Sequence, residues 1–265
     1  MKHIEQIDFY GLKLSLFSKL ELIQRIIDVI LNNEKIICYG YSLGTIYLMK
    51  KSPEIYTYGN QADILVTDGR LLYLFAKILN FPLRCDISIP NLVKLLLEFA
   101  NEHKLSVFLL GADKETNSNA VRNLRLAYPN IIVPDGIDGY FKHEEENDII
   151  ARINRVSPDI VLIGISSPIK ERLAFTWKDR LNTKIIVPCG GMIDVFAGKT
   201  KQSPNLIKKL GLASVYRIIQ EPKRILKRNL KIYYYVFFKF LPIFFLKVIL
   251  KRDKNFSIPE FLNIN

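Results

Sequence analysis

Short apolar runs alternate with amphipathic stretches along the first 200 residues of the chain. Six of these runs are rich in Ile, Val or Leu, and Gly or Asp follows each within a few residues. Buried parallel strands have this pattern when ligand-binding loops follow their carboxyl ends. We therefore predict strands at 35–39, 64–66, 106–110, 131–134, 160–163 and 184–188.

Helical periodicity fills the segments between these runs. The predicted helices cover 20–32, 42–51, 71–79, 91–102, 114–127, 144–156 and 170–181. Tyr128-Pro129 and Ser157-Pro158 end two of them, because a residue before proline disfavours helical backbone. No repeat of 20–50 residues is visible. Alternating strands and helices predict an α/β fold, with a mostly parallel, Rossmann-like sheet sandwiched by helices.

The pattern changes after about residue 200. Two short helices are expected at 206–211 and 214–219, and from Pro222 onward Lys and Arg alternate with Leu, Ile, Tyr and Phe. The apolar segment 232–250 is interrupted by Lys239, Pro242 and Lys247, which makes it a poor membrane span. We predict a pair of interfacial helices broken at Pro242, and the alternative is that this segment packs against its own domain or a partner chain.

The net charge of +12 is concentrated in this tail. Residues 199–254 contain 15 Lys and Arg but only two acidic residues, so the rest of the chain is close to neutral. Such a tail suits nucleic acid, an anionic membrane or a phosphate-rich ligand. Its aliphatic and aromatic residues favour the membrane and argue against nucleic acid. We expect a catalytic domain at 1–199 and a basic, amphipathic, helical, membrane-associating appendage at 200–265.

Cysteine usage and the N-terminus indicate the compartment. Cys38, Cys85 and Cys189 are far apart and form no CxxC pair, which argues against disulfides and a zinc site. The N-terminal segment does not resemble a signal peptide. A cytoplasmic protein is expected.

The chemistry must come from the loops after the strands, because no P-loop, HExxH or complete GxGxxG motif is present. His3, His103 and His143 lie in polar surroundings typical of surface residues. Asp68 follows the strand at 64–66 and precedes Gly69, at the edge where open α/β folds bind ligands. It could act as a general base or simply cap the next helix.

Four further loops are weak signals individually. In the functional interpretation, the glycines and helix N-termini bind phosphates, and Tyr140 and Phe141 stack on a base. In the structural interpretation, each loop is an ordinary turn. The candidates are Gly111; Asp135, Gly136, Asp138, Gly139, Tyr140 and Phe141; Ser166, Ser167, Lys170 and Glu171; and Gly190, Gly191 and Asp194.

The order of these motifs resembles the WecG/TagA/CpsF family of glycosyltransferases over residues 35–230. Six segments match in order: Ala62-Asp63 to Asp68-Gly69, Leu110-Gly111, Asp138 to Phe141, Ser166 to Glu171, Gly190 to Gly198, and Tyr216-Arg217 to Glu221-Pro222-Lys223-Arg224.

The resemblance implies an inverting, metal-independent transferase that moves a sugar from a UDP-sugar to a polyprenyl (undecaprenyl) diphosphate-linked saccharide, without a cofactor, at the cytoplasmic face of the membrane. It places the catalytic base at Asp68 and the donor site at Asp194 and the glycine-rich loops. The acceptor diphosphate and the membrane would meet Arg217, Arg224, Lys227 and Arg228. No DxD metal motif is present, since Asp135 and Asp138 are three residues apart. A monomer and a homo-oligomer both stay open at this point.

Three departures from the family pattern fall where donor and acceptor should lie. Gly40 and Ser42 occupy the positions where the family has Thr-x-Asn. The family's Arg-x-x-Gly-x-Asp motif, expected after the helix that follows Asp68-Gly69, is not evident. Lys170 stands where the family has a glutamine. Lys170 could pair with a diphosphate or a uronic acid carboxylate, or be a solvated surface lysine. The departures keep one alternative open, a catalytically degenerate adaptor that binds nucleotide or lipid at the membrane.

Overall fold

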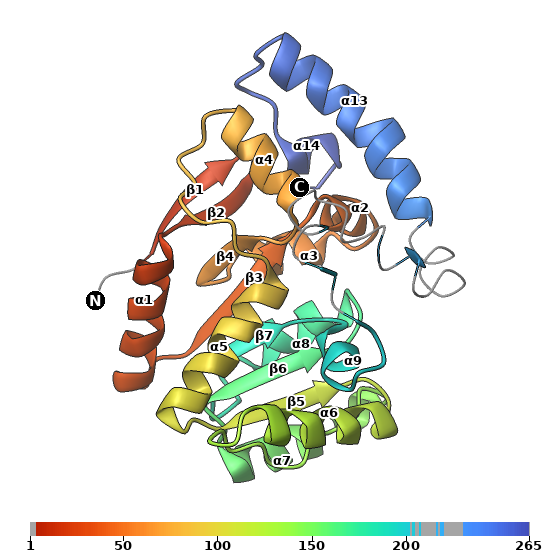
Figure 1. Cartoon of the computed structure of the whole chain (residues 1–265). Coiled ribbons are helices and arrows are strands. Elements are labelled where there is room, and N and C mark those ends of the chain that lie inside the picture. Colours follow the sequence, from red (N-terminus) through yellow and green to blue (C-terminus); the bar gives the residue numbers. More distant parts are fainter. Residues whose placement is uncertain are drawn as a thin grey trace.

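A computed structural model describes residues 4–201, 203, 204, 207, 216, 218, 219 and 230–264. Its centre is a five-stranded, fully parallel sheet in the order β4-β3-β7-β6-β5, which confirms the predicted α/β class (Figure 1). The strands are β3 (Ile36–Tyr41), β4 (Ile64–Thr67), β5 (Val107–Gly111), β6 (Ile160–Gly164) and β7 (Ile185–Pro188).

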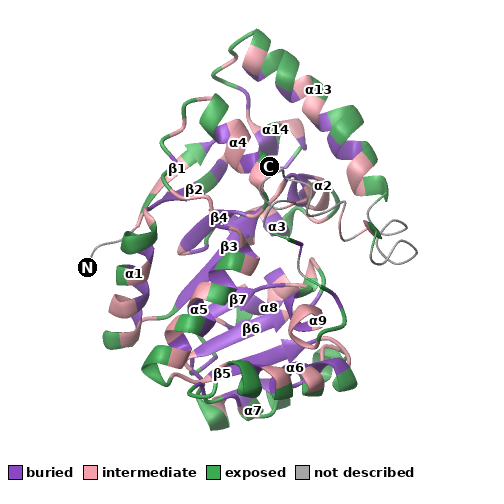
Figure 2. Ribbon diagram, viewed as in Figure 1, coloured by how far each residue is buried: buried purple, intermediate pink, exposed green. Residues whose placement is uncertain are grey.

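Helices cover both faces of this sheet and bury its apolar residues in two core clusters (Figure 2). One cluster contains residues of α1 (Lys19–Leu31), α5 (Ile89–His103), α6 (Lys114–Ala127) and α9 (Met192–Phe196). The other contains residues of α2 (Leu43–Lys51), α3 (Glu54–Asn60), α4 (Arg70–Ile78), α7 (Glu146–Val156) and α8 (Ile169–Trp177). A short helix, η1 (His143–Glu145), precedes α7.

An N-terminal hairpin was not predicted from the sequence. Its strands, β1 (Glu5–Phe9) and β2 (Leu12–Leu16), pair antiparallel around Tyr10 and Gly11, whose φ angles are 52° and 89°. In β2, Leu12 and Leu14 are fully buried while Lys13 between them is exposed, as the period of two requires. The hairpin thereby extends the core beyond the parallel sheet.

The predicted strand at 131–134 is wrong. This segment makes one isolated bridge, from Ile132 to Ser106, and a second joins Ile137 to Leu110 further along, so the chain runs along the outer edge of β5. Pro134 lies between the two bridges and has no N–H to donate to a continuous ladder.

The predicted break at Pro242 is also wrong. One helix of 21 residues runs from Leu230 to Leu250 and includes η2 (Val236–Phe240), α13 (Leu241–Phe244) and η3 (Phe245–Leu250). Its turns widen just before the proline, where the N–H of Leu241 donates to the carbonyl of Val236, five residues back. Wider turns of this kind accommodate an irregularity that would otherwise interrupt the helix. The short helices predicted at 206–211 and 214–219 fall mostly outside the described residues.

The inner face of this helix packs on the domain, next to α2 and the hairpin. Phe244 lies 6.4 Å from Phe9, 5.7 Å from Tyr10 and 6.1 Å from Phe75, measured between ring centroids. The chain then returns through α14 (Ile258–Phe261) to the hairpin, where the N–H of Ile258 donates to the carbonyl of Tyr10. The C-terminal segment therefore shares the core of the α/β domain.

Candidate active site at the carboxyl edge of the sheet

The carboxyl ends of all five parallel strands lie at one edge of the sheet (Figure 1). The chain leaves β3, β4 and β6 toward the face covered by α2, α4 and α8, but leaves β5 and β7 toward the face covered by α6 and α9. Open α/β sheets bind ligands where the chain leaves neighbouring strands toward opposite faces of the sheet. The candidate ligand position is thus over the ends of β3, β7 and β6.

Asp68 lies at this edge, directly after β4. Its N–H donates to the carbonyl of Tyr41 at 2.7 Å, and its Oδ1 accepts a hydrogen bond from the N–H of Ile89 at 3.1 Å. Ile89 is the first residue of α5. The carboxylate is therefore oriented by α5 across the edge, whereas the sequence suggested a cap for α4, the helix that follows it.

Gly40, one of the departures from the family pattern, provides space for this aspartate. A Cβ atom at Gly40 would lie 2.9 Å from Cβ of Asp68 and 2.7 Å from Cγ1 of Ile89. Both distances are shorter than real Cβ contacts. A larger residue here would displace the candidate base or the start of α5.

Packing accounts for Gly111. A Cβ atom there would lie 2.5 Å from the backbone of Gly164 on the neighbouring strand, and φ is 139°. The buried side chain of Asn117, which the sequence did not single out, donates to the carbonyls of Gly111 at 2.8 Å and Ile137 at 3.0 Å. The close approach of two strands explains this glycine without a ligand.

The two aromatic residues of the loop at 138–141 differ in exposure. The N–H of Tyr140 donates to Oδ1 of Asp138 at 3.0 Å, and the Tyr140 side chain is 83 % exposed. Phe141 is half-buried, and its ring centroid lies 6.1 Å from that of Trp177 at an interplanar angle of 30°. Of the two, Tyr140 has the accessible ring, and Phe141 anchors the loop.

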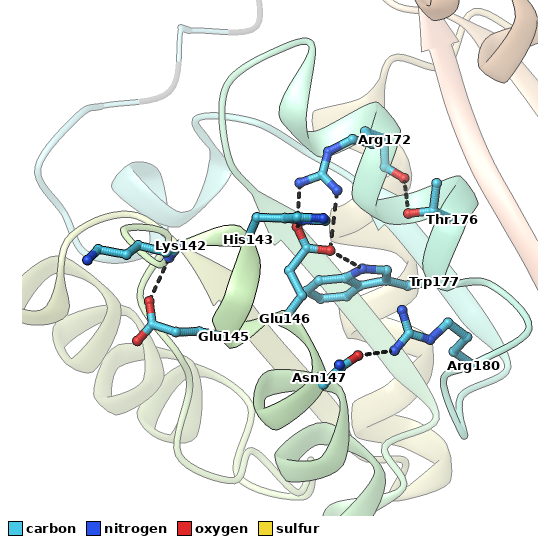
Figure 3. A network of polar contacts seen from close by, with 9 residues as sticks. All are labelled: Lys142, His143, Glu145, Glu146, Asn147, Arg172, Thr176, Trp177 and Arg180. Carbon is cyan, nitrogen blue, oxygen red and sulfur yellow. Dashed lines mark hydrogen bonds and ion pairs between the residues drawn. The ribbon is translucent and has the colours of Figure 1, made fainter.

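A buried carboxylate, Glu146, fixes the segment after this loop to α8 (Figure 3). It accepts hydrogen bonds from Arg172 at 2.6 Å and Trp177 at 3.0 Å, and pairs with His143 at 2.7 Å. Burial raises the pKa of Glu146, but the hydrogen bonds from Arg172, His143 and Trp177 outweigh it and hold this pKa at about 2. The network stabilises the position of α8 relative to α7.

The N-terminal end of α8 carries a second buried carboxylate. Oε1 of Glu171 accepts hydrogen bonds from Tyr39 Oη at 3.1 Å, Ser167 Oγ at 2.8 Å and Lys170 Nζ at 2.6 Å. The Lys170 ammonium also lies 5.1 Å from the centroid of the Tyr39 ring. The structure thus joins Ser167, Lys170 and Glu171, as predicted for one loop, and adds Tyr39 from β3, which the sequence analysis missed.

The loop after β7 completes this edge. Gly190 has a φ of 55°, and among the described residues no atom lies within 4 Å of the position that a Cβ would take there. Asp194 is half-buried in α9, and its carbonyl accepts the N–H of Lys199 at 3.0 Å. Lys199 in turn pairs with Asp113, the cap of α6, at 3.1 Å. The loops after β5 and β7 are therefore tied together.

The four predicted acceptor residues, Arg217, Arg224, Lys227 and Arg228, lie outside the described residues. Their roles stay predictions, as do those of all the other candidate site residues. Within the described ranges, no group of three or more His, Cys, Asp or Glu side chains is arranged to hold a metal ion.

The long C-terminal helix has exposed residues along its length (Figure 2), and most of them are large and apolar. Its exposed large apolar side chains are Leu230, Tyr234, Phe237, Phe238, Phe245, Leu246 and Leu250, and Lys231, Lys239 and Lys247 are exposed beside them. Within the part of the chain that the structure describes, this helix alone is long and apolar enough to cross a membrane.

The parallel sheet and the polar groups at its carboxyl edge define a Rossmann-like α/β protein with a ligand-binding edge. The sequence profile of the glycosyl transferase WecG/TagA/CpsF family matches residues 7–253. The chain belongs to this family and is a glycosyltransferase.

Two relatives from Staphylococcus aureus illustrate the similarity. Both are called N-acetylglucosaminyldiphosphoundecaprenol N-acetyl-beta-D-mannosaminyltransferase. The protein of strain MRSA252 is 29 % identical and that of strain MW2 is 28 % identical, each over 232 residues. The matches cover 84 % of this chain and 87 % of each relative.

Proposed function

We propose that this transferase moves a sugar, with inversion and without a metal ion, from a UDP-sugar to a polyprenyl diphosphate-linked saccharide during cell-surface polysaccharide synthesis. The names of the relatives support the acceptor class, because they specify N-acetylglucosaminyldiphosphoundecaprenol as acceptor and N-acetylmannosamine as the sugar. The family resemblance supports the UDP-sugar and the inverting course. The proposal assigns catalysis to residues 1–199 and membrane association to residues 200–265, whose helix at 230–250 packs on the catalytic part.

The observation that carries this proposal is the position of Asp68. The carboxylate follows β4 at the ligand edge, is oriented by the N–H of Ile89, and has space because residue 40 is glycine. In the proposed step, Asp68 removes the proton from the acceptor hydroxyl while the hydroxyl oxygen attacks the anomeric carbon of the donor sugar. The bond to the UDP oxygen breaks on the opposite side of that carbon, and the electron pair leaves with the diphosphate.

We place the protein at the cytoplasmic face of the membrane as a peripheral or monotopic protein. The outer face of the 230–250 helix would enter the boundary between headgroups and acyl chains, while Lys239 and Lys247 reach headgroups. Its inner face is packed on Phe9, Tyr10 and Phe75. Crossing the bilayer would require leaving these contacts, so a helix lying on the surface is the simpler arrangement.

The test is a panel of UDP-sugars with a short-chain prenyl diphosphate-linked N-acetylglucosamine acceptor. The expected result is acceptor-dependent release of UDP and a product one sugar longer, in the presence of a chelator. Binding of UDP and vesicles without turnover on any donor would favour the degenerate adaptor instead.

A further inference from the structure

Lys170 places a positive charge near the carboxyl edge of the sheet, in the loop and helix that follow β6. It lies at the start of α8, after β6, and its ammonium lies 5.1 Å from the ring centroid of Tyr39, a residue of β3. The lysine therefore follows β6 and lies near the ring of a residue on β3, two strands away in the order of the sheet.

Glu171 forms an ion pair with this lysine at 2.6 Å. The glutamate side chain is 1 % exposed, whereas that of Lys170 is 16 % exposed and is the accessible member of the pair. Hydrogen bonds from Tyr39 and Ser167 fix the same carboxylate oxygen that Lys170 contacts. The other oxygen, Oε2, has no hydrogen-bond partner among the described residues.

The ammonium of Lys170 keeps donor capacity beyond this pair. An ammonium has three N–H groups, and within the described ranges only the bond to Glu171 is made. A lysine held by a buried glutamate can still direct its remaining N–H groups at phosphate oxygens, as the Lys–Glu pair of protein kinases does. The remaining N–H groups of Lys170 could therefore bind an anionic group of a ligand at the carboxyl edge of the sheet.

We propose that Lys170 binds an anionic oxygen of the sugar donor, and that Glu171 and Tyr39 are positioning residues that aim it. The inference rests on the proposed function and deepens it. The anionic oxygen belongs either to the diphosphate or to a carboxylate on the transferred sugar. In the first case, the ammonium stabilises the charge that grows on the diphosphate oxygen as the anomeric bond breaks, with no proton transfer required.

The experiment compares the full-length wild type with a neutral-pair variant, Lys170→Gln combined with Glu171→Gln. Both charges are removed because Lys170→Gln alone would leave a buried, uncompensated carboxylate and destabilise the fold. Affinities for UDP and for uridine are measured by calorimetry, and transfer rates are measured with matched neutral and carboxylate-bearing UDP-sugars. Thermal melting checks that the variant folds.

If Lys170 meets the diphosphate, the variant should lose roughly 10- to 100-fold in affinity for UDP and none for uridine, since a hydrogen bond to a charged group has about that effect. If it meets a sugar carboxylate, UDP affinity stays the same and the preference for the acidic donor falls by a similar factor. The matched control is Lys178→Gln with Asp63→Asn, another partly buried pair, 2.8 Å apart, next to the start of β4. It should change neither readout.

A folded variant with wild-type discrimination between UDP and uridine, and wild-type preference between donors, overturns the inference about Lys170. That result leaves the proposed function intact if the wild type makes product. A wild type that neither distinguishes UDP from uridine nor transfers sugar contradicts the proposed function itself.

Discussion

The aromatic residues on the outer face of the 230–250 helix should control membrane binding. Phe237, Phe238 and Phe245 are 50 %, 69 % and 51 % exposed, so each can bury about half of a ring in the membrane interface. Full burial of such a side chain contributes about 1.5–3 kcal/mol, hence about 1 kcal/mol per half-buried ring. Replacing all three by Ser should therefore weaken partitioning by roughly 100-fold, and Ser has a helix propensity close to that of Phe.

The assay is sedimentation with vesicles that contain anionic phosphatidylglycerol, over a range of lipid concentrations. A matched control replaces three exposed apolar residues on the body of the domain, Leu31, Leu126 and Ile132, by Ser. The control should bind vesicles like the wild type. Equal partitioning of the helix variant and the control would refute the assignment of this face to the membrane.

Two further changes test the packing that supports the site. The pKa of Glu146 is about 2 in the folded chain against an ordinary 4.5, so its ionisation stabilises the fold fully above about pH 5 and progressively less toward pH 2. Glu146→Gln should lower the free energy of unfolding, measured with urea, by on the order of 3 kcal/mol at pH 7 and by clearly less at pH 3. Equal losses at both pH values would contradict the network. Gly40→Ala should cost about 1–3 kcal/mol and reduce transfer, because its Cβ would meet Asp68 and Ile89. Gly44→Ala is the control, because among the described residues its Cβ would make ordinary contacts of 3.4 Å and 3.5 Å. Equal melting temperatures for the two variants would count against the crowding at Gly40.

Local patterns predicted the parallel sheet because its strands are short, apolar and followed by Gly or Asp. The hairpin was missed because its turn, Tyr10-Gly11, is not one of the usual Asn-Gly or Asp-Gly signals, although the alternation in Leu12–Leu16 was present. From the sequence alone, Pro242 predicts a break, because the widened turn that accommodates it has no signature in the sequence.

The candidate site was predictable only in part. Loops after parallel strands must share an edge, so the positions of Asp68 and Lys170 followed from their order in the chain. Their partners did not, because these contacts join distant parts of the sequence: Asp68 to Ile89, and Glu171 to Tyr39 on β3. Such pairs depend on how helices pack across the sheet.

The most direct test of the account compares Asp68→Asn with the wild type. Asparagine keeps the oxygen that accepts the N–H of Ile89, so the start of α5 should be preserved, but it cannot take a proton from the acceptor at neutral pH. The measurement is kcat/KM for sugar transfer on one donor and acceptor, with UDP affinity and thermal melting as controls. We predict normal melting, unchanged UDP affinity and a loss of about 10²–10⁴-fold in kcat/KM. Equal transfer rates at equal stability would remove Asp68 from catalysis and contradict the account.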